Sequence, residues 1–327
     1  MFKVAVIIPT LNEELYIASC LESIRSQTYP FDRMDILVVD GGSNDRTVEI
    51  VDKFSSIYSN VRLLNNPGRI QSIAFNIGVK NSDAPYIIRL DAHVYYDEHY
   101  IERCMYYLET MPEVGDVGGI CETKVRRFGI IPESIAVLCQ SKFGIGGAAF
   151  RIGASAGYVD TVPFGAFPRK VINEIGGMRE DLARAEDNEY VSRIRKAGYK
   201  IYLNPSIFSI YYARDTFVGI IKQMYGNGES IGILNYVDKD AIGLRHMIPL
   251  IFVFGLLLGV ILSIVFRPFV YVYLSGLALY FICNILASLQ CSLKHGIKFL
   301  IPLSILFFVV HVSYGMGTIK GLIKKKY

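Results

Sequence analysis

Three long uncharged stretches near the C-terminus limit what this chain can fold into. They cover residues 247–266, 269–292 and 299–319, and none contains Asp, Glu, Lys or Arg. A helix of about 20 apolar residues is long enough to cross the hydrocarbon core of a bilayer. A buried core helix can imitate one such stretch, whereas three in succession favour a membrane-embedded C-terminal region.

The distribution of charge supports this interpretation. The 327 residues carry 34 Lys and Arg against 30 Asp and Glu, a net charge of +4. No acid occurs after residue 240, but eight of the bases do: Arg245, Arg267, Lys294, Lys298, Lys320, Lys324, Lys325 and Lys326. The first 240 residues therefore carry 26 bases (the 34 less these eight) against 30 acids. The excess of bases belongs to the apolar tail, which indicates a membrane rather than nucleic acid as partner.

The N-terminal sequence shows no secretory signal. Its apolar run at residues 4–8 is too short for one and is followed at once by Pro9. The six cysteines show neither metal-binding spacing nor a disulfide pattern, which is typical of a reducing compartment. We therefore expect the first 240 residues to stay on the cytoplasmic side of the cell membrane.

Strand and helix signals alternate through the first ninety residues. Four apolar runs predict strands, and three amphipathic stretches predict helices between them: strands at 4–8, 36–39, 61–64 and 86–90, helices at 13–26, 46–54 and 72–79. This order predicts an α/β fold with a parallel sheet covered by helices on both faces. Ligands of such sheets bind beyond the carboxyl ends of the strands.

Polar side chains follow three of the expected strand ends: Thr10, Asn12 and Glu13; Asp40, Ser43 and Asn44; Asp91 and His93. Side chains of an extended segment alternate in direction, so Asp91 and His93 project to the same side and could reach one cation together. A polar strand end that enters an ordinary loop is the alternative. Because all three loops are expected at one edge of the sheet, a ligand site is favoured.

Two later segments remain open to more than one interpretation. A short helix is expected at residues 186–196, and acids in its first turn also suit the helix dipole without any catalytic role. Residues 112–170 are less regular, and their glycines do not form a dinucleotide-binding fingerprint. This segment is either an acceptor-binding loop or a plain surface loop.

Six motifs in sequence order carry a resemblance to a known family: PTLNE (9–13), VVDGGSNDRT (38–47), RLDAH (89–93), FGAFPRK (164–170), GGM (176–178) and AEDNEYVSRIRKAGYKI (185–201). Together they resemble the inverting family 2 glycosyltransferases of GT-A fold, and especially the succinoglycan-type exopolysaccharide enzymes. The resemblance covers residues 3–230 and implies a Rossmann-like, mostly parallel sheet flanked by helices. We accordingly expect a catalytic domain at 1–230, an amphipathic juxtamembrane linker at 231–246 and two or three transmembrane helices within 247–327.

The resemblance also implies roles for individual residues. A nucleotide-sugar donor, with a UDP-sugar preferred, would be bound by Pro9, Thr10, Asn12, Glu13, Asp40, Arg69, Asp91 and Arg214. Asp187 matches the general base of the family, and Glu186 would orient the groups around it; Glu186 and Asp160 are the next candidates for the base. Gln223 matches the start of the Q-x-x-R-W motif of processive relatives, but Gly226 and Asn227 replace its Arg and Trp. Addition of one sugar is therefore expected rather than polymerisation.

A divalent metal bound to the donor diphosphate would be held by Asp91 and His93. Many members of the family have a second acid where this chain has His93. Because an imidazole suits Mn²⁺ better than Mg²⁺, Mn²⁺ is the preferred cofactor and Mg²⁺ the alternative.

The sequence thus predicts a membrane-bound glycosyltransferase of the hexosyltransferase type. The expected acceptor is a lipid-linked saccharide in exopolysaccharide or related glycan synthesis, and polyprenyl phosphate is the alternative. A non-catalytic nucleotide-sugar-binding scaffold is disfavoured by the intact Asp40, Asp91 and Asp187. Three crossings would place the C-terminal lysines on the far side, against the positive-inside tendency. Two crossings and one interfacial or re-entrant segment would keep them inside, and this arrangement is favoured.

Overall fold

The computed structural model describes residues 2–324 and 326 of the 327-residue chain. The chain divides into two compact units, Met1–Glu122 with Ala149–Tyr211, and Thr123–Ala148 with Tyr212–Tyr327. Of the C-terminal lysines considered above, Lys325 lies outside the described residues.

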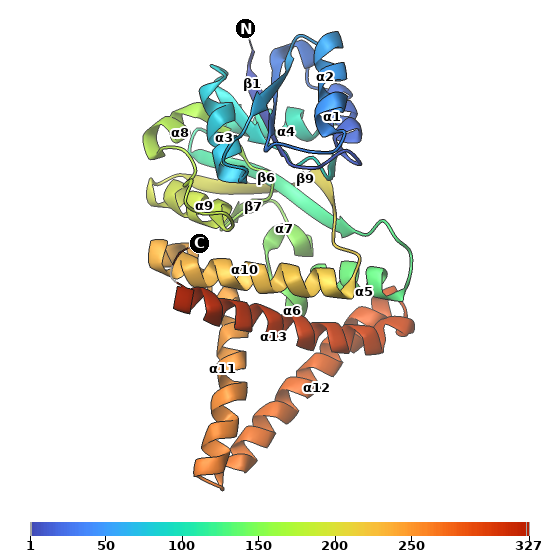
Figure 1. The fold of residues 1–327 in the computed structure, drawn as a ribbon, viewed down its shortest axis with the longest axis vertical. Helices are drawn as coiled ribbons and strands as arrows, with labels where there is room; N and C mark the ends of the chain where they lie inside the picture. The colour runs from blue at the N-terminus through green and yellow to red at the C-terminus, as the bar shows by residue number, and fades with distance from the viewer. Residues whose placement is uncertain (1, 325, 327) are drawn as a thin grey trace. The chain divides into compact units, whose positions relative to one another are not determined.

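A nine-stranded sheet forms the centre of the first unit (Figure 1). Its strands are β1 (Val4–Thr10), β2 (Met34–Asp40), β3 (Val61–Asn65), β4 (Tyr86–Arg89), β5 (Val94–Tyr96), β6 (Val114–Lys124), β7 (Gly157–Val159), β8 (Ala166–Pro168) and β9 (Lys200–Tyr212). They follow the order β3-β2-β1-β4-β8-β6-β9-β5, and β7 pairs with β9. Pairing is parallel among β1 to β4 and antiparallel between β4 and β8, β6 and β8, β5 and β9, and β7 and β9. The expected α/β architecture is confirmed, with a parallel half and an antiparallel extension.

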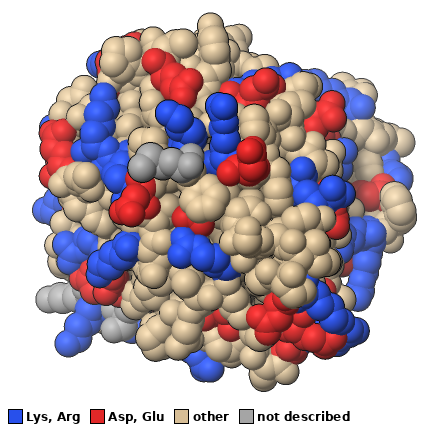
Figure 2. All heavy atoms as spheres, turned by 90° about the horizontal axis from the view of Figure 1, so that it is seen from above, with Lys and Arg blue, Asp and Glu red and all other residues tan. Residues whose placement is uncertain are grey.

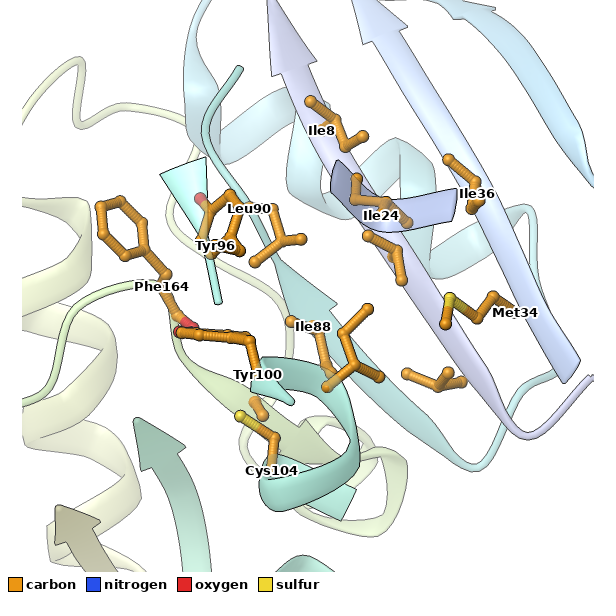
Figure 3. Packing of buried hydrophobic residues seen from close by; sticks show 14 of the residues in the cluster. Ile8, Ile24, Met34, Ile36, Ile88, Leu90, Tyr96, Tyr100, Cys104 and Phe164 are labelled. Carbon is orange, nitrogen blue, oxygen red and sulfur yellow. The ribbon is translucent and has the colours of Figure 1, made fainter. Parts of the chain in front are cut away.

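Helices of the first unit cover both faces of this sheet: α1 (Ile17–Arg25), α2 (Thr47–Ile57), α3 (Gln71–Lys80), α4 (Tyr100–Thr110), α7 (Ala149–Ile152), α8 (Arg169–Ile175) and α9 (Glu186–Lys196), with a 3₁₀ turn at Phe31–Arg33. Successive side chains of β1 point to opposite faces of the sheet and so contribute to two hydrophobic cores. Val6 and Ile8 belong to the core that contains residues of α1 and α4, whereas Ile7 belongs to the core that contains residues of α3, α8 and α9. Figure 3 shows the first core, in which Ile8, Ile24 and Ile36 converge between the sheet and α1.

The second unit is helical: α5 (Ile130–Cys139), α6 (Lys142–Ile145), α10 (Phe217–Val237), α11 (Leu244–Val265), α12 (Phe269–His295) and α13 (Leu300–Lys324), with 3₁₀ turns at Lys239–Ala241 and Ile297–Phe299. The segments Leu244–Val265, Phe269–His295 and Ile297–Lys324 are long and apolar enough to cross a membrane, by length and composition. Residues 231–246, where a linker was expected, comprise the end of α10, a 3₁₀ turn and the start of α11.

Exposed side chains differ in kind along the chain. On the face shown in Figure 2, acidic and basic side chains are interspersed rather than gathered into one basic area. By contrast, α11 and α12 expose large apolar side chains along their whole length, from Ile248 to Leu293. Exposing apolar surface to water costs about 25 cal/mol of free energy per Å². A lipid environment for these two helices is consistent with this cost.

Candidate active site

Asp40 organises the loop that follows β2. Its Oδ2 accepts hydrogen bonds from the backbone N–H of Gly42 at 2.9 Å and of Ser43 at 2.8 Å, and its Oδ1 accepts from the Ser43 hydroxyl at 2.5 Å. The Thr10 hydroxyl lies 3.4 Å from the same Oδ1. Asp40 is only 6% exposed, so this carboxylate holds the ends of β1 and β2 together at the carboxyl edge of the sheet.

The loops after β1, β2 and β3 are joined by further hydrogen bonds. The backbone N–H of Asn12 donates to the Ser43 hydroxyl at 2.8 Å, and that of Glu13 donates to the Thr47 hydroxyl at 2.8 Å. Arg69 donates from Nε to the Gly41 carbonyl oxygen at 3.0 Å. Asn12 and Arg69 both have positive φ, 57° and 61°. The structure therefore brings together the expected donor-binding residues of these three loops, including Pro9 at the end of β1.

Glu13 and His93, both expected at this edge of the sheet, form a direct contact that was not predicted. Glu13 Oε1 lies 3.0 Å from Nδ1 of His93, although the two residues are 80 positions apart. The rings of Tyr16 and Tyr211 meet the His93 ring edge-on, with centroids at 6.3 and 5.8 Å. The orientation of the imidazole is therefore restricted by two aromatic rings and by a carboxylate that contacts one of its ring nitrogens.

Arg89, the last residue of β4, connects two parts of the site. Its side chain is 10% exposed, and its guanidinium lies 3.5 Å from Asp91 Oδ1 and 3.6 Å from Glu186 Oε1. Asp91 Oδ1 is buried and accepts no hydrogen bond from any residue that the structure describes. Sequence reasoning missed Arg89. The available signal was an arginine placed directly after the apolar run of residues 86–88.

The protonation of this cluster follows from burial and charge. Burial, followed by the negative charge of Asp187, raises the pKa of Glu186 to about 7, against the opposing charge of Arg89. Burial lowers the pKa of Arg89, but the carboxylates of Asp91, Glu186 and Asp187 outweigh it and raise that pKa above its ordinary value. Arg89 is thus a permanent cation between groups of opposite charge.

The two adjacent acids at the start of α9 lie in different environments. Glu186 is 5% exposed, whereas Asp187 is exposed and accepts a hydrogen bond from the backbone N–H of Asn188 at 2.8 Å. Glu189, the third acid of this turn, pairs with Arg193 at 2.7 Å. A purely structural role therefore fits Glu189, while Asp187 presents a carboxylate to solvent next to a buried neighbour.

The metal expected from the resemblance can be compared with the side chains present. Among the described residues, no group of three or more His, Cys, Asp or Glu side chains is arranged to hold a metal ion. The buried Asp91 oxygen without a hydrogen bond, and an imidazole whose other nitrogen contacts a carboxylate, nevertheless fit a metal that takes its remaining ligands from a substrate. Arg214 and Gln223 belong to the second unit, in the segment before α10 and in α10 itself.

A mixed sheet of this topology, with polar loops at the carboxyl edge, is the arrangement expected of the GT-A fold. Residues 5–175 match the model of glycosyl transferase family 2, and the chain belongs to this family. It is 29% identical over 328 residues to the dolichyl N-acetyl-alpha-D-glucosaminyl phosphate 3-beta-D-2,3-diacetamido-2,3-dideoxy-beta-D-glucuronosyltransferase of Methanococcus voltae, covering 98% of this chain and 97% of the relative. It is 31% identical over 262 residues to the succinoglycan biosynthesis protein ExoA of Rhizobium meliloti (strain 1021), covering 78% of each.

Solved structures confirm the fold. The mannosyltransferase PcManGT from Pyrobaculum calidifontis, in complex with GDP-Man and Mn²⁺, superimposes with a TM-score of 0.65 at 18% sequence identity, covering 99% of this chain and 88% of that one. The family and the GT-A fold expected from the sequence motifs are therefore confirmed, and the chain is a glycosyltransferase.

Proposed function

We propose that this glycosyltransferase moves one sugar from a nucleotide sugar, with a UDP-sugar as the expected donor, to a lipid-linked saccharide at the cytoplasmic face of the cell membrane. The observation that carries the proposal is the exposed Asp187 beside a buried Glu186 that Arg89 links to Asp91. The names of two relatives, one acting on a dolichyl-linked sugar phosphate and one in succinoglycan biosynthesis, support a lipid-linked or polysaccharide acceptor.

Residues at the carboxyl edge of the sheet would bind the donor. Asp40 and Glu13, in loops already joined by hydrogen bonds, would hold the nucleoside together with Pro9, Thr10 and Asn12. Arg69 would contact the nucleotide, and Arg214 is the residue that the family resemblance assigns to the diphosphate. A cation suits that role because charge develops on the diphosphate as it leaves.

Asp91 and His93 would hold a divalent metal, with Mn²⁺ preferred and Mg²⁺ possible. The contact between Glu13 and Nδ1 of His93 supports this role, because histidines that bind metals commonly donate their other ring N–H to a carboxylate. When bound, such a metal neutralises the leaving diphosphate as a Lewis acid. His93 fits Mn²⁺ better than a site made only of oxygen ligands would.

Asp187 would act as the general base of an inverting transfer. The acceptor hydroxyl oxygen bonds to the anomeric carbon from the face opposite the diphosphate, and the bond from that carbon to the diphosphate breaks. The hydroxyl proton moves to the Asp187 carboxylate, and the diphosphate keeps the bonding electron pair. Base assistance of this kind contributes about 10²–10⁴-fold. Glu186 and Arg89 would fix the position of this turn of α9.

Direct transfer to polyprenyl phosphate is the second candidate, and Asp187 distinguishes the two. A phosphate acceptor is already ionised at neutral pH and needs no base, whereas a saccharide hydroxyl does. The three apolar segments are compatible with either lipid acceptor. The dependence of the rate on Asp187 therefore reports on the chemical class of the acceptor.

The test uses membranes that contain the full chain, offered a panel of labelled nucleotide sugars with Mn²⁺, Mg²⁺ or a chelator. Thin-layer chromatography of the lipid products identifies the donor and the acceptor class. Asp187→Asn is expected to lower turnover about 10²–10⁴-fold with donor affinity by calorimetry nearly unchanged, and Asp181→Asn, an exposed acid paired with Arg179, serves as the matched control. Near-normal turnover of Asp187→Asn would favour a phosphate acceptor, and lost donor binding would make Asp187 a binding residue. Absence of transfer from every donor would favour a non-catalytic scaffold.

A further inference from the structure

We infer that the chain crosses the bilayer twice, as a hairpin of α11 and α12, and that α13 lies with α10 along the membrane surface on the side of the first unit. The inference rests on the proposed membrane location, but not on the donor, the acceptor or catalysis. Length and composition alone would allow the segment Ile297–Lys324 to be a third crossing. The contact between α10 and α13 argues against that.

Glycines bring the backbones of α10 and α13 into direct contact. A Cβ added to Gly317 would lie 2.0 Å from the Tyr225 carbonyl oxygen, and one added to Gly321 would lie 2.0 Å from the Glu229 carbonyl oxygen. Four residues forward on α13 therefore correspond to four residues forward on α10, so the two helices are parallel (Figure 1). Gly228 of α10 makes a matching approach to α13. Small residues four positions apart are a known basis for such close packing.

Charged side chains accompany this contact. Glu229 of α10 lies 3.1 Å from the Lys320 ammonium and 3.3 Å from the Lys324 ammonium of α13. Lys222, about two turns earlier on α10, is exposed. Ionised side chains at the centre of a bilayer are costly, so the pair of α10 and α13 suits the headgroup region better than the hydrocarbon core.

The parallel direction also restricts the path of the chain. α10 begins at Phe217, shortly after β9 ends at Tyr212, so its N-terminus lies on the side of the first unit. Residues 238–243, which join α10 to α11, span at most about 20 Å when extended and cannot cross a core of about 30 Å. The end of α10 and the start of α11 therefore lie on the same side.

Either way of letting α13 cross contradicts this path. If α10 stays on the near side while α11 and α12 go out and return, a crossing α13 would leave α10 and lose the contact along its length. If α10 crosses with α13, then α11 returns, α12 goes out and α13 returns, which makes α13 antiparallel to α10. Among paths in which α11 and α12 cross, the observed parallel contact therefore fits only two crossings, with α10 and α13 on the near side.

The hairpin itself has the properties of a membrane-spanning pair. α11 (22 residues) and α12 (27 residues) are about 33 and 40 Å long at 1.5 Å per residue. They are joined through Arg267–Pro268, and Figure 1 shows α11 and α12 meeting at their ends far from α13. An arginine at that end can reach the opposite headgroup layer.

One apolar stripe on α13 faces the same way as the hairpin. Its exposed large side chains are Ile301, Ile305, Met316 and Ile323, which fall within about 60° of one another at about 100° per residue. Gly315, which contacts the Pro249 carbonyl of α11, lies about 40° from this stripe on the same scale. The hairpin thus extends away from α13 on the side that carries the stripe. The stripe therefore faces the membrane into which the hairpin inserts.

The test determines on which side of the membrane three engineered cysteines lie in the full chain. In a Cys283→Ser/Cys291→Ser background, single substitutions Ser59→Cys in the first unit, Arg267→Cys at the hairpin end and Lys326→Cys near the C-terminus are labelled with a membrane-impermeant maleimide. Labelling is compared between intact cells, inverted vesicles and detergent-solubilised protein. Ser59→Cys and Lys326→Cys are expected to label from one side, and Arg267→Cys from the other.

Each other outcome has a distinct meaning. Lys326→Cys on the side opposite Ser59→Cys would show a crossing α13 and overturn the inference. All three cysteines on one side would show that the hairpin does not cross, which also overturns it. Because only relative sides are compared, the inference survives if the first unit faces outward, although the cytoplasmic location proposed above would then fail.

Discussion

Replacing Arg89 with methionine tests the ionic centre of the site. The Arg89 side chain is 10% exposed and lies between the carboxylates of Asp91 and Glu186, at 3.5 and 3.6 Å. Methionine keeps an unbranched stem of similar length but removes the cation. The substitution therefore leaves two poorly solvated carboxylates without their partner, and changes the packing little.

The expected cost follows from that loss. Removing one member of a buried ionic pair typically destabilises by about 3–5 kcal/mol, because the remaining charge stays buried and uncompensated. Glu186 limits the cost at low pH, since its pKa is already raised to about 7 and removal of Arg89 would raise it further. A carboxyl group with a raised folded-state pKa favours the folded state while protonated and loses that contribution as pH rises. The deficit of Arg89→Met is therefore larger at pH 8 than at pH 5.

The assay is thermal unfolding of the full chain in detergent at both pH values. A deficit of about 3–5 kcal/mol corresponds to a fall in the midpoint of about 6–20 °C for a unit of this size. Arg89→Lys keeps the charge but cannot contact two carboxylates as a guanidinium does. Its thermal midpoint should therefore lie between those of the natural chain and of Arg89→Met. The combination Arg89→Met/Glu186→Gln should recover part of the loss, because it removes one of the stranded charges.

The matched control is Arg25→Met, which breaks an exposed pair with Glu22 and should cost less than about 1 kcal/mol. An Arg89→Met midpoint that matches this control at both pH values would refute the reasoning. So would a deficit that is independent of pH, or one that Glu186→Gln makes worse.

Substitutions at four further residues, with Gly276→Val as a control, give separate outcomes. His93→Ala should weaken metal-dependent donor binding, and His93→Asp should keep activity and shift preference towards Mg²⁺; unchanged metal dependence in the alanine variant would show that His93 is not a ligand. Asp91→Asn should bind the donor more weakly in calorimetry, whereas Asp187→Asn should bind it almost normally. Glu186→Gln should gain stability over the natural chain as pH rises from 4.5 towards 8, by up to about 3 kcal/mol, because the natural residue must ionise while buried. Gly321→Val should lower the thermal midpoint by forcing α10 and α13 apart, while Gly276→Val, where a Cβ meets nothing within 4 Å, should not.

The parallel half of the sheet was predictable because its signals are local. Each of β1, β2 and β4 is an apolar run that ends at a polar residue, and Asp40 and Asp91 were found from that pattern alone. The antiparallel half gave no such signal. β5, β7 and β8 have three residues each, too few for a recognisable alternation. They form only because longer strands such as β9 provide hydrogen-bonding partners.

The end of α10 was missed for an energetic reason. Its sequence around Gly226, Gly228 and Gly232 is poor in helix formers, and each glycine costs about 1 kcal/mol relative to alanine in an isolated helix. Two of these glycines permit the backbone contact with α13, so the packing gained offsets the propensity lost. A partner helix 90 residues away in the chain cannot be read from a local window.

Arg89 changes how the two expected parts of the site relate to each other. The sequence treats Asp91 as part of donor binding and the acids of α9 as part of base catalysis, with no link between them. In the structure one buried cation contacts both Asp91 and Glu186. Residues that share a partner do not contribute independently. A change in the charge at Asp91 therefore alters the attraction that Arg89 exerts on Glu186, so the proposed donor site and the proposed base at the start of α9 are coupled through one buried cation.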